Sequence, residues 1–90
     1  MFGKREEKLP PLERALEAAA GLKAGSWDSV EALSMLSIEA HGRAEARSLY
    51  DSAVDASRSL SHGSWESVRA LTWLARAGRR FNEDERKPGG

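Results

Sequence analysis

The sequence contains no cysteine, so it can form neither a disulfide framework nor a thiolate site, and a cytoplasmic setting is expected. Long apolar runs are also missing. Residues 15–25 are interrupted by Glu17 and Lys23 and are far shorter than the roughly 20 residues of a membrane span. Residues 1–8 contain no apolar segment of the kind found in secretory signals. An excess of one charge is absent too, since 14 basic residues balance 14 acidic ones, which removes the bulk-charge argument for a nucleic-acid or membrane partner.

What is present suits one small globular domain, because 40% of the 90 residues are hydrophobic. A domain of this size buries only about 60% of the surface that its unfolded chain exposes. It is therefore marginally stable alone and gains from association with another chain.

An internal duplication organises the chain. The block Gly-Ser-Trp-Asp-Ser-Val at residues 25–30 recurs as Gly-Ser-Trp-Glu-Ser-Val at residues 63–68. When residues 12–40 are aligned with residues 50–78, 11 of 29 positions are identical. The chain is therefore predicted to consist of two similar units.

Each unit is predicted to form a helix, a tight turn and a second helix. The glycine of each block is expected to have positive φ, because the helix must stop and reverse within two residues. The serine that follows is expected to cap the second helix, and the tryptophan to pack over the preceding helix at equivalent places in both units. These structural roles fall to Gly25, Ser26, Trp27, Gly63, Ser64 and Trp65.

The predicted fold class is all-α, since no stretch has the period-two alternation of a strand. Two tandem helical hairpins, residues 11–40 and 43–80, are expected to form one four-helix, bundle-like domain over residues 9–80. Residues 1–8 and the charged tail 81–90 are predicted to be disordered.

Residues 25–33 and their repeat at 63–71 resemble the start of the second helix in tetratricopeptide repeats. Each of the two segments has a glycine, a polar residue, an aromatic residue and then apolar residues at helical spacing, as the family does. The period here is 38 residues, against about 34 in that family. The resemblance implies a scaffold for protein–protein interaction without catalysis.

The sequence offers little for catalysis or metal binding. His41 and His62 have no partner at ligand spacing, and the carboxylates fall on predicted solvent faces. No catalytic residue, cofactor or metal site is predicted, and the chain is not expected to be an enzyme.

The last helix has two faces of interest. Its core face is expected to carry Val68, Leu71, Thr72 and Ala75, which correspond to Val30, Leu33, Ser34 and Ser37 in the first unit. A second, basic face holds an aromatic among arginines, a combination that binds single-stranded nucleic acid. The alternative, which we favour, is that arginine stems simply cover the tryptophan. The nucleic-acid candidates are Arg69, Trp73, Arg76, Arg79 and Arg80.

Several apolar residues fall outside the predicted core faces, which favours burial against a second copy of the chain. Residues 9–55 have a net charge of −4 and residues 56–80 a net charge of +4, which suits either self-association or packing within the chain. The leading hypothesis is a protein-interaction module that forms a homodimer. The alternatives are a nucleic-acid-binding accessory protein and, more remotely, a small-ligand pocket lined by Trp27 and Trp65. The predicted interface residues are Met35, Leu36, Ile38, Trp73 and Leu74.

Overall fold

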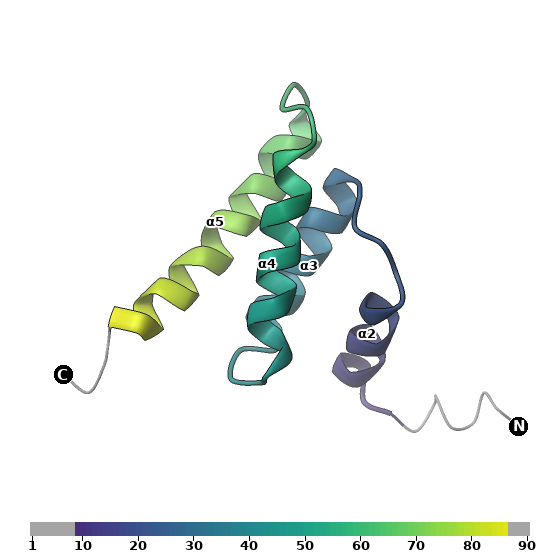
Figure 1. Ribbon diagram of the computed structural model, residues 1–90, viewed down its shortest axis with the longest axis vertical. Helices are drawn as coiled ribbons and strands as arrows, with labels where there is room; N and C mark the ends of the chain where they lie inside the picture. Colours follow the sequence, from purple (N-terminus) through teal and green to yellow (C-terminus); the bar gives the residue numbers. More distant parts are fainter. Residues whose placement is uncertain (1–8, 87–90) are drawn as a thin grey trace, which may run out of the picture.

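The computed structural model describes residues 9–86, and over them the chain is entirely helical, without strands. Figure 1 shows the four helices: α2 (Pro11–Ala20), α3 (Trp27–Glu39), α4 (Glu45–Arg58) and α5 (Trp65–Arg86). They pack against one another in a bundle-like domain, so the predicted all-α fold class is confirmed. The predicted disorder of residues 1–8 lies outside the described residues.

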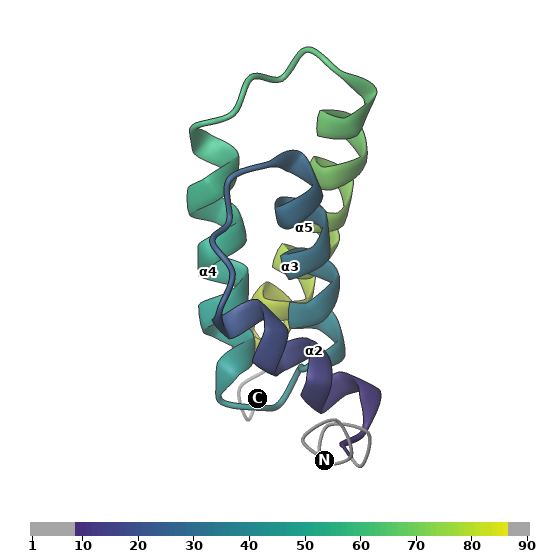
Figure 2. The ribbon, with the colours of Figure 1, turned by 90° about the vertical axis from the view of Figure 1, so that its right-hand side faces the viewer.

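Helix α3 is the centre of the molecule. It packs extensively against both α4 and α5, whereas α2 touches α3 over a short stretch only. The domain is a flat triangle of 43 × 41 × 17 Å, in which α4 lies over α3 and α5 (Figures 1 and 2). Since a helix with its side chains is about 10–12 Å across, this thickness allows no more than two layers. Helices α2 and α5 lie at opposite edges of the plate, with α3 and α4 between them (Figure 1).

Serines cap the N-terminal ends of the two repeated helices, as the sequence predicts. Ser26 Oγ accepts a hydrogen bond from the Ser29 N–H at 3.2 Å, and Ser29 Oγ accepts one from the Ser26 N–H at 3.0 Å. The same exchange recurs at α5, where the Ser67 N–H donates to Ser64 Oγ at 3.1 Å. These side chains satisfy amides that a helix start leaves without intrahelical partners.

The predicted positive φ at Gly25 and Gly63 is wrong. Among the described residues, Gly42 alone has a positive φ, of 96°. The chain spreads its reversals over residues 21–26 and 59–64 instead of turning within two residues, so neither block glycine needs the left-handed region. The tight reversal lies between α3 and α4, where Gly42 supplies it.

The core is made of small side chains. Val30 is fully buried among alanines of α4 and α5, and four serines are buried with it. Each buried serine hydroxyl donates to a carbonyl of its own helix, as Ser34 does to Val30 at 2.7 Å. Small residues let α3, α4 and α5 approach closely, but they bury little apolar area and limit the stability of the domain.

The core face predicted for the last helix is wrong. On α5 it is Ser67, Ala70 and Ala77 that are buried, with Leu74 packed against the core. The residues predicted for this role are largely on the surface: Val68, Thr72 and Ala75 are exposed and Leu71 is half-buried. On α3 the corresponding prediction is correct, since Val30, Ser34 and Ser37 are buried and Leu33 packs against the core. The difference arises because α3 is covered on two sides and α5 on one.

The end of α5 also differs from the prediction. The helix continues to Arg86, so the predicted disordered tail is wrong for residues 81–86. Phe81 provides a reason, because its ring lies 5.1 Å from that of Tyr50 and 5.9 Å from that of His41. These contacts attach this part of α5 to α4 and to the turn after α3, while residues 87–90 lie outside the described part.

Candidate interaction surfaces

The two repeated tryptophans begin their helices at equivalent positions, but only one is covered. The indole N–H of Trp27 donates to the Ser61 carbonyl at 2.8 Å, and its ring lies 5.6 Å from that of His62. Trp27 is also packed against the core cluster. Trp65, in contrast, is 85% exposed, so the prediction that both tryptophans pack over the preceding helix is wrong for Trp65. The second unit covers Trp27, and no described element takes the same place over Trp65.

The same asymmetry holds one turn further along each helix. Val30 is fully buried, whereas its repeat equivalent Val68 is 50% exposed. Val68 lies on an open groove of about 650 Å³ along α5 that also carries Arg76 and Arg79. We call Trp65 and Val68 the outer knob, and their covered equivalents Trp27 and Val30 the inner knob.

A second apolar surface lies on the other side of the molecule, where α2 meets α3. It is an open groove of about 440 Å³, and its walls are almost entirely apolar. Leu22 at its rim is 75% exposed and Met35 is 41% exposed. We call five residues of its wall the outer socket: Ala15, Ala18, Leu22, Ala32 and Leu36.

An ion pair between equivalent positions connects the two units. Arg69 Nε lies 3.0 Å from Glu31 Oε1, and the two residues are 38 positions apart, which is the repeat period. The same position of the repeat therefore holds an acidic residue in the first unit and a basic residue in the second. A second pair, Arg43 with Glu13 at 2.7 Å, attaches α2 to the turn after α3.

The predicted interface residues do not form one surface. Leu74 packs against the core within the chain, so it is not available to a partner. Leu36 and Met35 line the α2–α3 groove, whereas Trp73 lines the α5 groove. Ile38 is half-buried on α3.

The predicted basic face of α5 is partly engaged. The Arg76 guanidinium lies 5.4 Å from the centre of the Trp73 ring, the arrangement that we favour over nucleic-acid stacking. Arg69 is paired with Glu31. Arg79 and Arg80 remain exposed.

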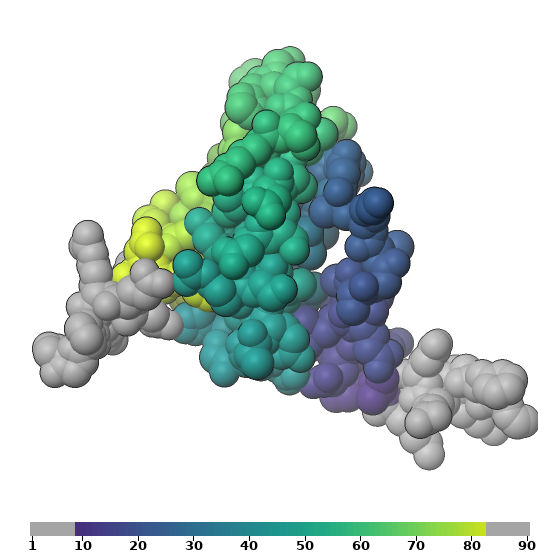
Figure 3. Space-filling model, in the orientation of Figure 1, coloured from purple at the N-terminus to yellow at the C-terminus, as the bar shows by residue number. Residues whose placement is uncertain are grey.

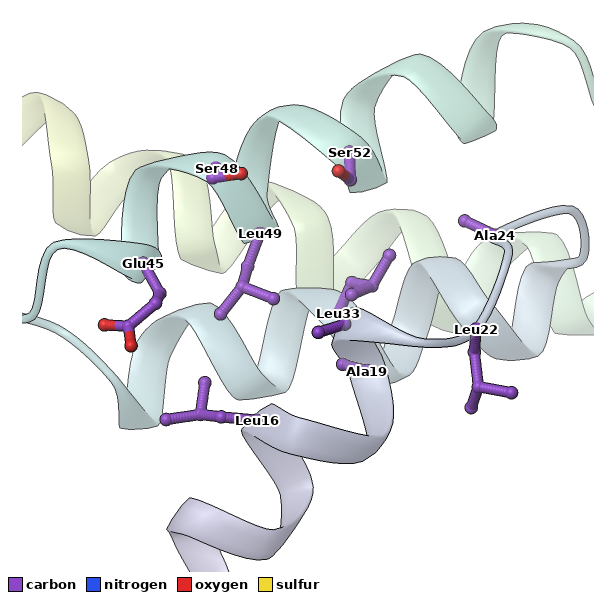
Figure 4. A pocket seen from close by; sticks show the side chains of 10 residues that line it. Leu16, Ala19, Leu22, Ala24, Leu33, Glu45, Ser48, Leu49 and Ser52 are labelled. Atoms are coloured by element: carbon purple, nitrogen blue, oxygen red, sulfur yellow. The ribbon is translucent and has the colours of Figure 1, made fainter.

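A cavity of about 350 Å³ lies between α2, α3 and α4, and the space-filling view is hollowed there (Figure 3). Leu16 and Leu49 point toward each other across it, with Glu45 and two serines at its edge (Figure 4). Neither Trp27 nor Trp65 lines it, so it is not the ligand pocket that the sequence suggested as a remote alternative.

Sequence reasoning missed the outer knob, although a signal for it was present. Residues 25–30 and 63–68 are nearly identical, so both units carry the same face. Two units in a row make one contact between them, which leaves one copy of each contact face unfilled.

The described residues contain no cluster of three or more His, Asp or Glu side chains that could hold a metal ion. None of the helices in residues 9–86 is long and apolar enough to cross a membrane. Comparisons with protein-family models, curated proteins and solved structures find no match for this chain.

Proposed function

We propose that this chain is a small, non-enzymatic helical-repeat protein that mediates protein–protein association, and that its first partner is another copy of itself. The observation that carries the proposal is the exposure of large apolar residues whose repeat equivalents are covered. Trp65, Val68 and Leu22 are 85%, 50% and 75% exposed. Trp65 and Val68 lie on α5 and Leu22 lies on the other side of the molecule, so two separate apolar surfaces are open, and soluble monomers seldom expose such surfaces without a binding role.

The composition of the core supports association as well. Alanine, serine and one valine provide most of the fully buried positions, so the isolated domain gains little from burial. A second copy would add apolar contact at both open grooves. The resemblance to tetratricopeptide repeats agrees with this role, because those repeats present surfaces for other proteins.

Sedimentation velocity of the 90-residue chain over a range of concentrations tests the proposal. We expect the weight-average sedimentation coefficient to rise between low and high micromolar concentration. Ala44→Glu is a suitable control, because Ala44 is exposed and lies in the turn before α4, outside the lining of either groove. A wild-type chain that remains monomeric over the whole range would contradict self-association.

A further inference from the structure

We propose that the chain associates head to tail, with the outer knob of one copy seated in the outer socket of the next. This contact would reproduce, between copies, the contact that the first unit makes with the second inside each chain. The inference rests on the proposed self-association and adds to it the surfaces and the register.

The contact inside the chain is the template. Val30 is buried in one cluster with Ala53 and Ala56 of α4 and Ala70 of α5. Leu60 and Leu74 pack against the same cluster. We call these five partners of the inner knob the inner socket.

The outer socket has the same residues as the inner socket. Subtracting the repeat period from each inner position gives Ala15, Ala18, Leu22, Ala32 and Leu36, so alanine replaces alanine and leucine replaces leucine at all five positions. All five line the open α2–α3 groove. The outer knob is identical to the inner knob in the same way, tryptophan for tryptophan and valine for valine. The knob and the socket that meet inside the chain are therefore each present a second time, and these second copies have no partner within the described residues.

The geometry prevents the outer knob and socket of one chain from meeting each other. At 100° per residue, Val68 and Thr72 lie on the side of α5 opposite Ala70 and Leu74, which face α3. Helices α5 and α2 lie at opposite edges of the plate, with α3 and α4 between them (Figure 1). The two surfaces therefore cannot fill each other within one chain. If a second copy fills them, the contact joins different patches of the two partners.

Charge favours this register over a two-fold pairing of α5 with α5. In the head-to-tail contact, Arg69 of one copy would lie beside Glu31 of the next copy, in addition to the Glu31 with which it pairs inside its own chain. The template for that pair is the 3.0 Å contact inside the chain. A two-fold pairing of the α5 grooves would instead place a groove that carries Arg76 and Arg79, and no acidic residue, against its own copy, so it would contain like charges without opposite ones.

Two variants that each block one surface test the register. Val68→Glu places a charge in the outer knob, and Ala32→Glu places one in the outer socket. Both positions are exposed, so both variants are expected to fold, which helical circular dichroism and a thermal midpoint close to that of Ala44→Glu would verify. If Val68→Glu fails to fold, Trp65→Ala replaces it, because Trp65 is 85% exposed.

We expect each blocked variant to sediment as a monomer under conditions in which the wild type associates. An equal mixture of the two should form a dimer and nothing larger. The intact knob of Ala32→Glu can bind the intact socket of Val68→Glu, and the two surfaces left over are both blocked. Association of either variant alone at the wild-type level would overturn the head-to-tail register, as would two monomeric variants that do not combine when mixed. Both results leave self-association standing, whereas a monomeric wild type would remove the proposed function together with the register.

Discussion

Truncating the two repeated tryptophans should have very different effects on the stability of the monomer. Removing a buried tryptophan side chain typically costs about 3–5 kcal/mol. Trp27 is half-buried and donates a hydrogen bond, so we expect Trp27→Ala to lower the free energy of unfolding by about 2–3 kcal/mol. Trp65 is 85% exposed, so Trp65→Ala should change it by no more than about 0.5 kcal/mol.

Thermal unfolding followed by circular dichroism measures this difference, at a concentration where the chain is monomeric. Since 1 kcal/mol corresponds to about 4–8 °C in a domain of this size, Trp27→Ala should lower the melting temperature by roughly 10–20 °C. Trp65→Ala should lower it by less than about 4 °C. Trp27→Phe is the matched variant, because it keeps one aromatic ring and removes the N–H donor to Ser61 together with the five-membered ring. Its cost should lie between about 1 kcal/mol and that of Trp27→Ala. Equal losses in the two alanine variants would refute the assignment of Trp65 to an uncovered face.

Three further predictions concern the turns, the caps and the basic face. Gly25→Ala should leave the free energy of unfolding unchanged or raise it by up to about 1 kcal/mol, because the added Cβ would meet nothing within 4 Å and the φ of Gly25 is not positive. Gly42→Ala should destabilise the domain, because Gly42 has a φ of 96°. Urea unfolding of both variants measures the difference. Ser26→Ala should cost about 1 kcal/mol in the same assay, while Ser26→Gly should cost only a few tenths. A labelled single-stranded oligonucleotide should not bind the chain at physiological salt, because Arg76 covers Trp73. Salt-sensitive binding that is lost when Arg79 and Arg80 are replaced would favour a nucleic-acid partner instead.

Local signals in the sequence predicted the local structure well. Ser26 and Ser64 cap their helices because a hydroxyl at a helix start acts within a few residues of the chain. The start of α3 at Trp27 and of α5 at Trp65 follow from the same signal. The extent of α5 was harder to predict, because Phe81 is held by Tyr50, which is far away in the sequence.

Burial on α5 could not be read from the helix alone. Its repeat of the α3 pattern correctly indicates a face that can be buried, but burial depends on what lies against that face. Val30 has the second unit beside it and is buried, whereas Val68 has no described neighbour in that place and is half exposed. The sequence therefore predicted which residues form the contact face, while the structure was needed to find which copy of it is filled.

Cross-linking between single cysteines tests the central claim most directly, because the chain has no cysteine of its own. Val68→Cys and Ala32→Cys place one thiol each in the outer knob and the outer socket. When the two variants are mixed with a short thiol-reactive cross-linker, we predict a covalent dimer containing one chain of each, identified by mass spectrometry. Each variant alone should give little covalent dimer, and a chain carrying both substitutions should give a ladder of larger species. Efficient cross-linking of Val68→Cys to itself, with none to Ala32→Cys, would contradict the account.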